Sequence, residues 1–184
     1  MALTESTMLE LGTTAPDFAL LDVVTGNTVR RDDFRGQKGL LVMFICTHCP
    51  FAKHIEKGLG QLSADYAGKL GIVGISSNDA ESYPDDSPAG LKRQAQTFGF
   101  KFPYLYDETQ DVARAYKAAC TPDLFLFDKG FELVYRGQFD SSRPSNGVPV
   151  TGDELRAAIN AVLRGEKPSA DQRASIGCNI KWKS

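Results

Sequence analysis

The chain has 184 residues, of which 42% are hydrophobic and 24% charged, and its formal net charge is −2. This composition is ordinary for a globular domain and excludes disordered, collagen-like and disulfide-scaffold proteins. At about 150 residues per domain we expect one domain over residues 1–184. The nearly balanced charge argues against nucleic acid or an anionic membrane as a partner.

The N-terminal region has no targeting pattern. Residues 1–15 lack the basic stretch and the long apolar run of a signal peptide. The longest apolar run, Leu40–Cys46, has seven residues, whereas a membrane span needs about 20. We therefore expect a cytoplasmic protein whose thiols are kept reduced. Residues 16–30 predict a hairpin within an N-terminal extension over residues 1–36, because turn residues at 25–27 separate two short strands.

The middle of the chain alternates strands and helices. Apolar runs and turn residues predict four further strands, at residues 40–46, 70–76, 124–127 and 132–136. Apolar stripes with helical spacing predict four helices, which begin at Pro50, at Pro88 after Ser87, at Asp107 with a stripe to Ala119, and at Thr151. The order β-β-β-α-β-α-α-β-β-α predicts an α/β sheet with helices on both faces.

The C-terminal tail, residues 164–184, has a different pattern. Ile176, Cys178, Ile180 and Trp182 alternate with glycine or polar residues. This period of two gives an extended segment one apolar face. We therefore expect the tail to be docked, with Cys178 facing the protein.

The chemically informative segment is Cys46-Thr47-His48-Cys49, a Cys-x-x-Cys motif between a buried strand and a helix. A helix N-terminus stabilises a thiolate and lowers the pKa of a cysteine from about 8.5. We expect Cys46 to be exposed and to attack a disulfide, and Cys49, shielded in the first turn, to resolve the mixed disulfide. His48, as a cation beside Cys46, and Thr47 are expected to tune the thiolate.

Other interpretations of this motif stay open. Both cysteines could be small core residues. Cys46, His48, Cys49 and His54 also contain enough nitrogen and sulfur ligands for zinc. Against zinc, the chain has no second Cys-x-x-Cys motif.

Two further cysteines are candidate accessory thiols. Cys120 lies two residues before Pro122 and is either a third redox thiol or an inert buried residue. Cys178 could reach the pair as a second resolving thiol, pack on the apolar face of the tail with Trp182, or bind a metal. The sequence leaves these alternatives open.

Seven segments together carry a family resemblance: APDFAL at 15–20, FRG at 34–36, LLVMFICTHCPF at 40–51, SNDAESYPDDSP at 77–88, FPYLYDETQDVARAY at 102–116, TPDLFLFD at 121–128 and SIGCNIKWK at 175–183. They resemble the alkyl hydroperoxide reductase and thiol-specific antioxidant family of the thioredoxin-like superfamily, in its peroxiredoxin-like branch with Cys-x-x-Cys. The resemblance implies a thioredoxin-like fold with a central mixed sheet and an N-terminal hairpin extension, and the pattern of the tail adds a docked C-terminal segment to it. It also implies oxidoreductase or antioxidant activity without an organic cofactor.

The resemblance implies roles for two places in the chain. Cys46 and Cys49 match the redox pair. Thr121-Pro122 matches the cis-proline loop that faces this pair, where the residue before proline offers backbone hydrogen bonds to a bound peptide.

The sequence also departs from the family pattern near the first cysteine. Leu40 replaces the buried acid of thioredoxins, so that any proton acceptor must lie elsewhere, and Met43 replaces the Thr or Ser of peroxiredoxins. We therefore predict a thiol-disulfide oxidoreductase that acts on protein or small-molecule disulfides and receives electrons from a thiol reductant system. Peroxidase activity through a Cys46 sulfenic acid and a metal-binding or interaction module are the alternatives.

Overall fold

Strand β4 (Gly39–Phe44) forms the centre of the fold in the computed structural model, which describes residues 2–184. Every residue of β4 is buried. Leu41 and Met43 pack into one apolar core, and Leu40 and Val42 pack into a second core on the opposite face. The continuous apolar run is therefore a strand covered on both sides, as predicted.

The main sheet has seven strands in the order β3-β2-β6-β5-β4-β8-β9. β4, β5 and β6 are parallel, whereas β8 runs antiparallel to β4 on its other side. The predicted hairpin, β2 and β3, extends the sheet beyond β6. The bounds are β2 (Ala19–Asp22), β3 (Thr28–Arg30), β5 (Gly71–Ser76), β6 (Tyr104–Tyr106), β8 (Asp123–Asp128) and β9 (Leu133–Arg136). The sheet is thus mixed, as the resemblance implied.

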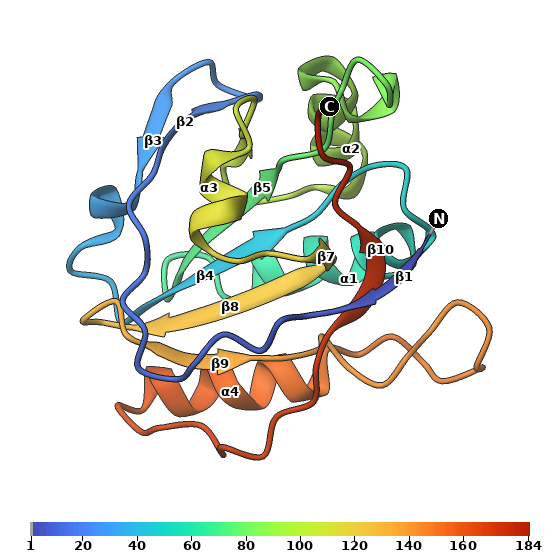
Figure 1. Cartoon of the computed structure of the whole chain (residues 1–184). Helices are drawn as coiled ribbons and strands as arrows, with labels where there is room; N and C mark the ends of the chain where they lie inside the picture. Colours follow the sequence, from blue (N-terminus) through green and yellow to red (C-terminus); the bar gives the residue numbers. More distant parts are fainter. Residues whose placement is uncertain (1) are drawn as a thin grey trace.

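Helices cover both faces of this sheet (Figure 1). α1, α2 and α4 contribute to the core on one face, and α3 packs with the N-terminal segment on the other. The bounds are α1 (Pro50–Asp65), α2 (Pro88–Phe98), α3 (Asp111–Ala115) and α4 (Asp153–Leu163), with short 3-10 helices η1 (Arg31–Phe34) and η2 (Pro84–Asp86). α4 begins two residues later than predicted, because the Asp140 carboxylate accepts hydrogen bonds from the N–H groups of Thr151 and Gly152, each at 2.7 Å.

The segment between α2 and β8 differs most from the prediction. Strand β6 precedes α3, but its three residues are too few to show a period in the sequence. Helix α3 ends at Ala115 instead of continuing toward Ala119, since Lys117 adopts a left-handed φ of 51°. Cys120–Thr121 then forms a short strand, β7.

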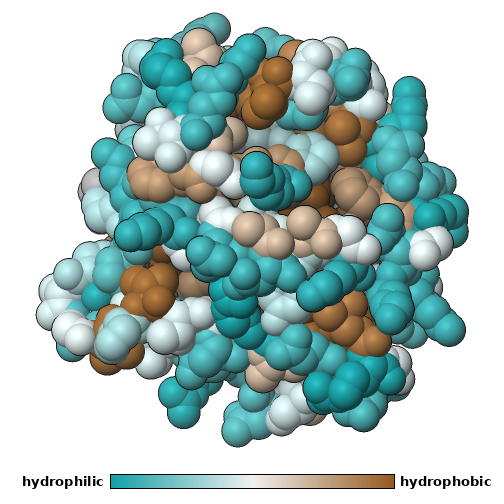
Figure 2. Space-filling view, turned by 180° about the vertical axis from the view of Figure 1, so that it is seen from behind, coloured by the Kyte–Doolittle hydropathy of each residue, from teal (hydrophilic) through white to brown (hydrophobic). Residues whose placement is uncertain are grey.

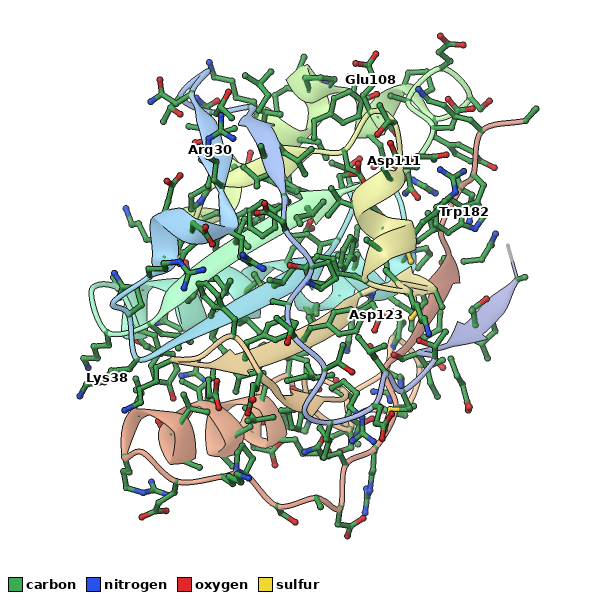
Figure 3. All side chains as sticks on the ribbon, turned by 60° about the vertical axis from the view of Figure 1, so that its left-hand side comes forward. Arg30, Lys38, Glu108, Asp111, Asp123 and Trp182 are labelled. Carbon is green, nitrogen blue, oxygen red and sulfur yellow. The ribbon has the colours of Figure 1, made fainter. Side chains whose placement is uncertain are left out.

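A second, antiparallel sheet holds the C-terminal tail. Strand β10 (Ile176–Asn179) lies between β1 (Leu3–Glu5) and β7, which Figure 1 shows at one end of the main sheet. The predicted docking of the tail is confirmed, with Cys178 buried. Trp182, by contrast, is 42% exposed, and the Arg114 guanidinium lies 5.0 Å from its ring (Figure 3). Cys178 therefore packs in the protein interior, but the alternative in which it packs there together with Trp182 is wrong, because the Trp182 side chain lies at the surface.

The face of the molecule opposite to the view of Figure 1 is mostly polar. Seen from behind, apolar side chains form small separate groups among hydrophilic residues (Figure 2). Between residues 2 and 184, no helix combines the length and apolar character needed to cross a bilayer.

Gly177 gives a test of the tail's docking. A Cβ at this position would lie 2.0 Å from the Thr121 carbonyl oxygen, and relieving such an overlap costs about 1–3 kcal/mol. We expect Gly177→Ala to accelerate amide hydrogen exchange in β10 by roughly 5- to 150-fold. Gly130→Ala, whose Cβ would meet only the Asp128 carboxylate at 3.4 Å, is the control and should leave β10 unchanged. Equal exchange in both variants would contradict the assigned close contact.

Candidate active site

The Cys-x-x-Cys motif lies where β4 leads into α1. The helix begins at Pro50, as predicted, and Cys49 is its N-cap residue. Cys46 and Cys49 are both completely buried. The expectation that Cys46 is exposed is therefore wrong, because these two cysteines form one buried cluster with Ala52 and with Cys178 of the tail.

The Thr121-Pro122 loop faces the two cysteines. The peptide bond before Pro122 is cis, as the resemblance implied. The Thr121 hydroxyl lies 3.3 Å from Cys46 Sγ, and Cys49 Sγ lies 3.3 Å from the Thr121 carbonyl oxygen, to which it donates when it is protonated. The backbone of Thr121 is paired with Cys178 of β10. The edge expected to receive a substrate peptide is thus occupied by the protein's own tail.

The helix N-terminus acts on Cys49 rather than on Cys46. The hydrogen bond from the Cys46 thiol is the main cause that lowers the pKa of Cys49, and the Cys178 thiol and the Ala52 N–H add to it against the effect of burial. Burial raises the pKa of Cys46, and the hydrogen bond to Cys49 and the charge of Asp86 raise it further. The helix N-terminus was expected to lower the pKa of Cys46. It acts on Cys49 instead, because α1 begins only after Cys49.

A buried carboxylate, Asp86 of η2, organises the two residues between the cysteines. It accepts hydrogen bonds from the Thr47 N–H at 2.7 Å, the Thr47 hydroxyl at 2.6 Å, His48 Nδ1, and Asn78 Nδ2 at 2.9 Å. Burial alone would raise the pKa of Asp86, but these bonds, led by the one from His48, hold it below its usual value. The His48 ring stacks on Tyr83 with centroids 4.8 Å apart. Thr47 and His48 therefore hold Asp86 beside the pair, while their effect on the thiolate stays a prediction.

The sequence did not single out Asp86, since it lies in an acidic loop, residues 79–89, whose other charges gave no reason to choose it. Its position directly before the Ser87-Pro88 helix start is the available clue. The Ser87 hydroxyl accepts from the Gly90 N–H and begins α2 there. The turn that starts this helix also points Asp86 inward.

A second polar chain reaches Cys46 from the opposite side. Gln94 Nε2 donates to the Cys46 carbonyl at 3.1 Å and to the Glu56 carboxylate at 2.8 Å. The Tyr104 hydroxyl donates to Gln94 Oε1 at 2.9 Å. Burial raises the pKa of Glu56. Asp86 contacts Thr47 and His48 of the motif directly, whereas Glu56 is linked to the Cys46 carbonyl through Gln94.

The zinc ligands considered from the sequence are not all brought together. His54 Nε2 bonds to the Ser142 hydroxyl at 2.6 Å instead of turning to the cysteines. The ligand atoms of Cys46, His48 and Asp86 do lie within 4.8 Å of one another. Within residues 2–184, the ligand atoms that come together are thus those of one cysteine, one histidine and one carboxylate. Cys49 and His54, which the sequence also offered as zinc ligands, are not among them.

Cys120 is close to the pair but contacts backbone. Its thiol donates to the Pro122 carbonyl at 3.5 Å. Burial and the neighbouring Asp123 carboxylate raise its pKa. This environment favours a protonated, unreactive thiol.

Comparison with known proteins places the fold and the motif in a family. The model of the AhpC/TSA family matches residues 11–136. The chain belongs to the AhpC/TSA family. Among curated members of the superfamily, the thiol-disulfide oxidoreductase ResA of Geobacillus kaustophilus (strain HTA426) is 32% identical over 130 residues, which span 71% of this chain and 70% of that protein.

Solved structures agree with this AhpC/TSA assignment. The crystal structure of an uncharacterized conserved protein from Geobacillus kaustophilus has a TM-score of 0.97 and 53% identity, covering 100% of this chain and 97% of that one. The solution structure of a thioredoxin-like protein in the oxidized form has a TM-score of 0.68 at 20% identity, covering 86% of this chain and 100% of that one. The fold is therefore thioredoxin-like, as expected.

Asp86 is testable through stability. Its pKa is lowered in the folded chain, so its contribution is complete above the unfolded pKa of about 3.9 and is lost as the pH falls through the lower folded value. Because an amide would face hydrogen-bond donors, we expect Asp86→Asn to destabilise the protein by about 1–3 kcal/mol at pH 7. The difference from the wild type should shrink as the pH falls below 4, about the usual aspartate pKa, measured by urea unfolding.

The control is Asp111→Asn, because the Asp111 side chain is 80% exposed. It should change the free energy of unfolding by less than about 0.5 kcal/mol. An unchanged stability of Asp86→Asn at pH 7 would show that the hydrogen bonds of this carboxylate contribute nothing.

Proposed function

We propose that the protein is a thiol-disulfide oxidoreductase that reduces protein or small-molecule disulfides through Cys46 and Cys49. The observation that carries this proposal is the pair itself, hydrogen-bonded at the N-cap of α1 and facing the cis-Pro122 loop. In this arrangement one sulfur is held as a thiolate while the other keeps its proton. A dithiol poised in this way can donate two electrons to a disulfide.

Cys46 is proposed as the attacking sulfur. Its proton moves across the S–H···S hydrogen bond to Cys49, and the Cys46 thiolate attacks one sulfur of the substrate, RSSR. The S–S bond of the substrate breaks, and the first RS⁻ leaves and takes up the proton that Cys49 had received, which restores the Cys49 thiolate. The Thr121 hydroxyl, 3.3 Å from Cys46 Sγ, can donate to the sulfur while it is charged.

Cys49 then resolves the mixed disulfide. The Ala52 N–H and the Cys178 thiol still stabilise its thiolate after Cys46 is bonded to substrate. Cys49 attacks Cys46 Sγ, the second RS⁻ leaves and is protonated, and a Cys46–Cys49 disulfide remains. Two electrons have passed to the substrate, and a thiol reductant system restores the dithiol. We propose the cytoplasm as the compartment because it supplies such reductants.

Hydroperoxide reduction is the second candidate. Membership of the AhpC/TSA family and the hydroxyl of Thr121 beside Cys46 favour it. Met43, where peroxiredoxins carry a hydroxyl, is buried in the core. We therefore rank disulfide exchange first.

Serine variants test the proposed roles. We expect Cys46→Ser and Cys49→Ser each to lower the turnover of a small disulfide, such as hydroxyethyl disulfide, by a factor on the order of 100 or more. Cys49→Ser should also accumulate a mixed disulfide at Cys46, detected by mass spectrometry after alkylation, because the resolving thiol is missing.

The matched control is Cys120→Ser, which removes a buried thiol that bonds to a backbone carbonyl and should keep full turnover. A mixed disulfide that accumulates only at Cys49, in Cys46→Ser, would reverse the two roles. Unchanged turnover in both serine variants would refute the function, and rapid oxidation by hydrogen peroxide but not by disulfides would favour the peroxidase.

A further inference from the structure

The tail occupies the edge where a substrate strand would pair. Extended peptides bind proteins by adding a strand to an exposed sheet edge. Here β10 is already paired antiparallel with β7, and Cys178 lies opposite Thr121, the residue before the cis proline. The strand that carries Cys178 therefore occupies the edge at which such a peptide would pair.

Three sulfur atoms follow one another across the site. Cys46, Cys49 and Cys178 lie together in one buried cluster, in which both other thiols lower the pKa of Cys49 and have their own pKa raised by it. Cys49 is the central sulfur, so it can form a bond with either neighbour.

Hydrogen bonds just before and just after β10 fix the position of Cys178. The Ser175 hydroxyl donates to the Pro122 carbonyl at 2.5 Å. The Lys181 N–H donates to Asn78 Oδ1 at 2.9 Å, and the Lys181 carbonyl accepts from Gln110 Nε2 at 2.9 Å. These bonds hold the tail in one register, so that the contact between Cys178 and Cys49 is built into the fold.

We propose that Cys178 is a third redox thiol, which takes over the disulfide from Cys46 by forming a bond with Cys49. In this step the Cys178 thiolate attacks Cys49 Sγ in the Cys46–Cys49 disulfide. The Cys46–Cys49 bond breaks, a Cys49–Cys178 bond forms, and Cys46 leaves as a thiolate that takes up the proton lost by Cys178. The exchange changes no oxidation state and needs no further oxidant, since the substrate disulfide has already supplied it.

The proposal rests on the proposed function for the first oxidation. It adds a second oxidised form of the protein, in which the disulfide joins Cys49 and Cys178. The oxidised protein then carries a free Cys46 thiol and a tail tied covalently to α1. Reductant must open the Cys49–Cys178 bond before the tail can leave the Thr121 edge. The covalently tied tail would keep a further disulfide substrate away from the oxidised site.

The test uses Cys46→Ser in the full chain, equilibrated in mixtures of reduced and oxidised glutathione. Thiols are trapped by acid and alkylation, and disulfides are mapped by mass spectrometry. We expect an intramolecular Cys49–Cys178 bridge, with two protein thiols lost per oxidised glutathione consumed. Cys46→Ser/Cys120→Ser should give the same bridge, and Cys46→Ser/Cys178→Ser should give only a glutathione adduct on Cys49.

Two results would overturn the proposal. Either Cys46→Ser carries glutathione on Cys49 while Cys178 stays free for alkylation, or both thiols stay free in excess oxidised glutathione. Circular dichroism of each variant checks folding. As a second measurement, wild-type protein oxidised by one equivalent of hydroxyethyl disulfide should show the Cys49–Cys178 bridge, and Cys178→Ser should show Cys46–Cys49 alone. Turnover of that disulfide by the wild type tests the proposed function separately.

Discussion

The site depends on the contact between the first turn of α1 and the strand pair formed by β7 and β10. At this contact the Ala52 N–H of the helix and the Cys46 and Cys178 thiols lower the pKa of Cys49. A charged sulfur is costly to bury unless several donors satisfy it. The arrangement provides those donors, and this is why a thiolate can exist in a site from which water is excluded.

Much of this arrangement could be predicted from the chain. The continuous apolar run of β4 and the Pro50 helix start determine where the motif lies, because both signals are local. The alternation in the tail correctly predicted an extended, docked segment. Only its end, at Trp182, departs from the pattern, since cation–π contact with Arg114 outside the core offers an amphipathic ring an alternative to burial.

Other parts of the site depend on contacts between residues distant in sequence. Asp86 reaches Thr47 and His48 across 39 and 38 residues, and Gln94 reaches Cys46 across 48. No local period marks a polar residue that will be buried by tertiary packing. The burial of Cys46 was missed for the same reason, because the strand and loop that cover it come from positions 120–122 and 176–179.

The burial of the cysteines means that the rate at which a reagent modifies them reports how often the site opens. Because Cys46 and Cys49 are completely buried, any reagent in solvent reacts only during brief local openings, most simply of the tail. The observed rate is then the intrinsic rate multiplied by the open fraction, and each 1.4 kcal/mol of opening free energy slows it about tenfold. Two relatives with identical cysteines could therefore differ widely in reactivity solely through the hydrogen bonds that anchor their last ten or so residues.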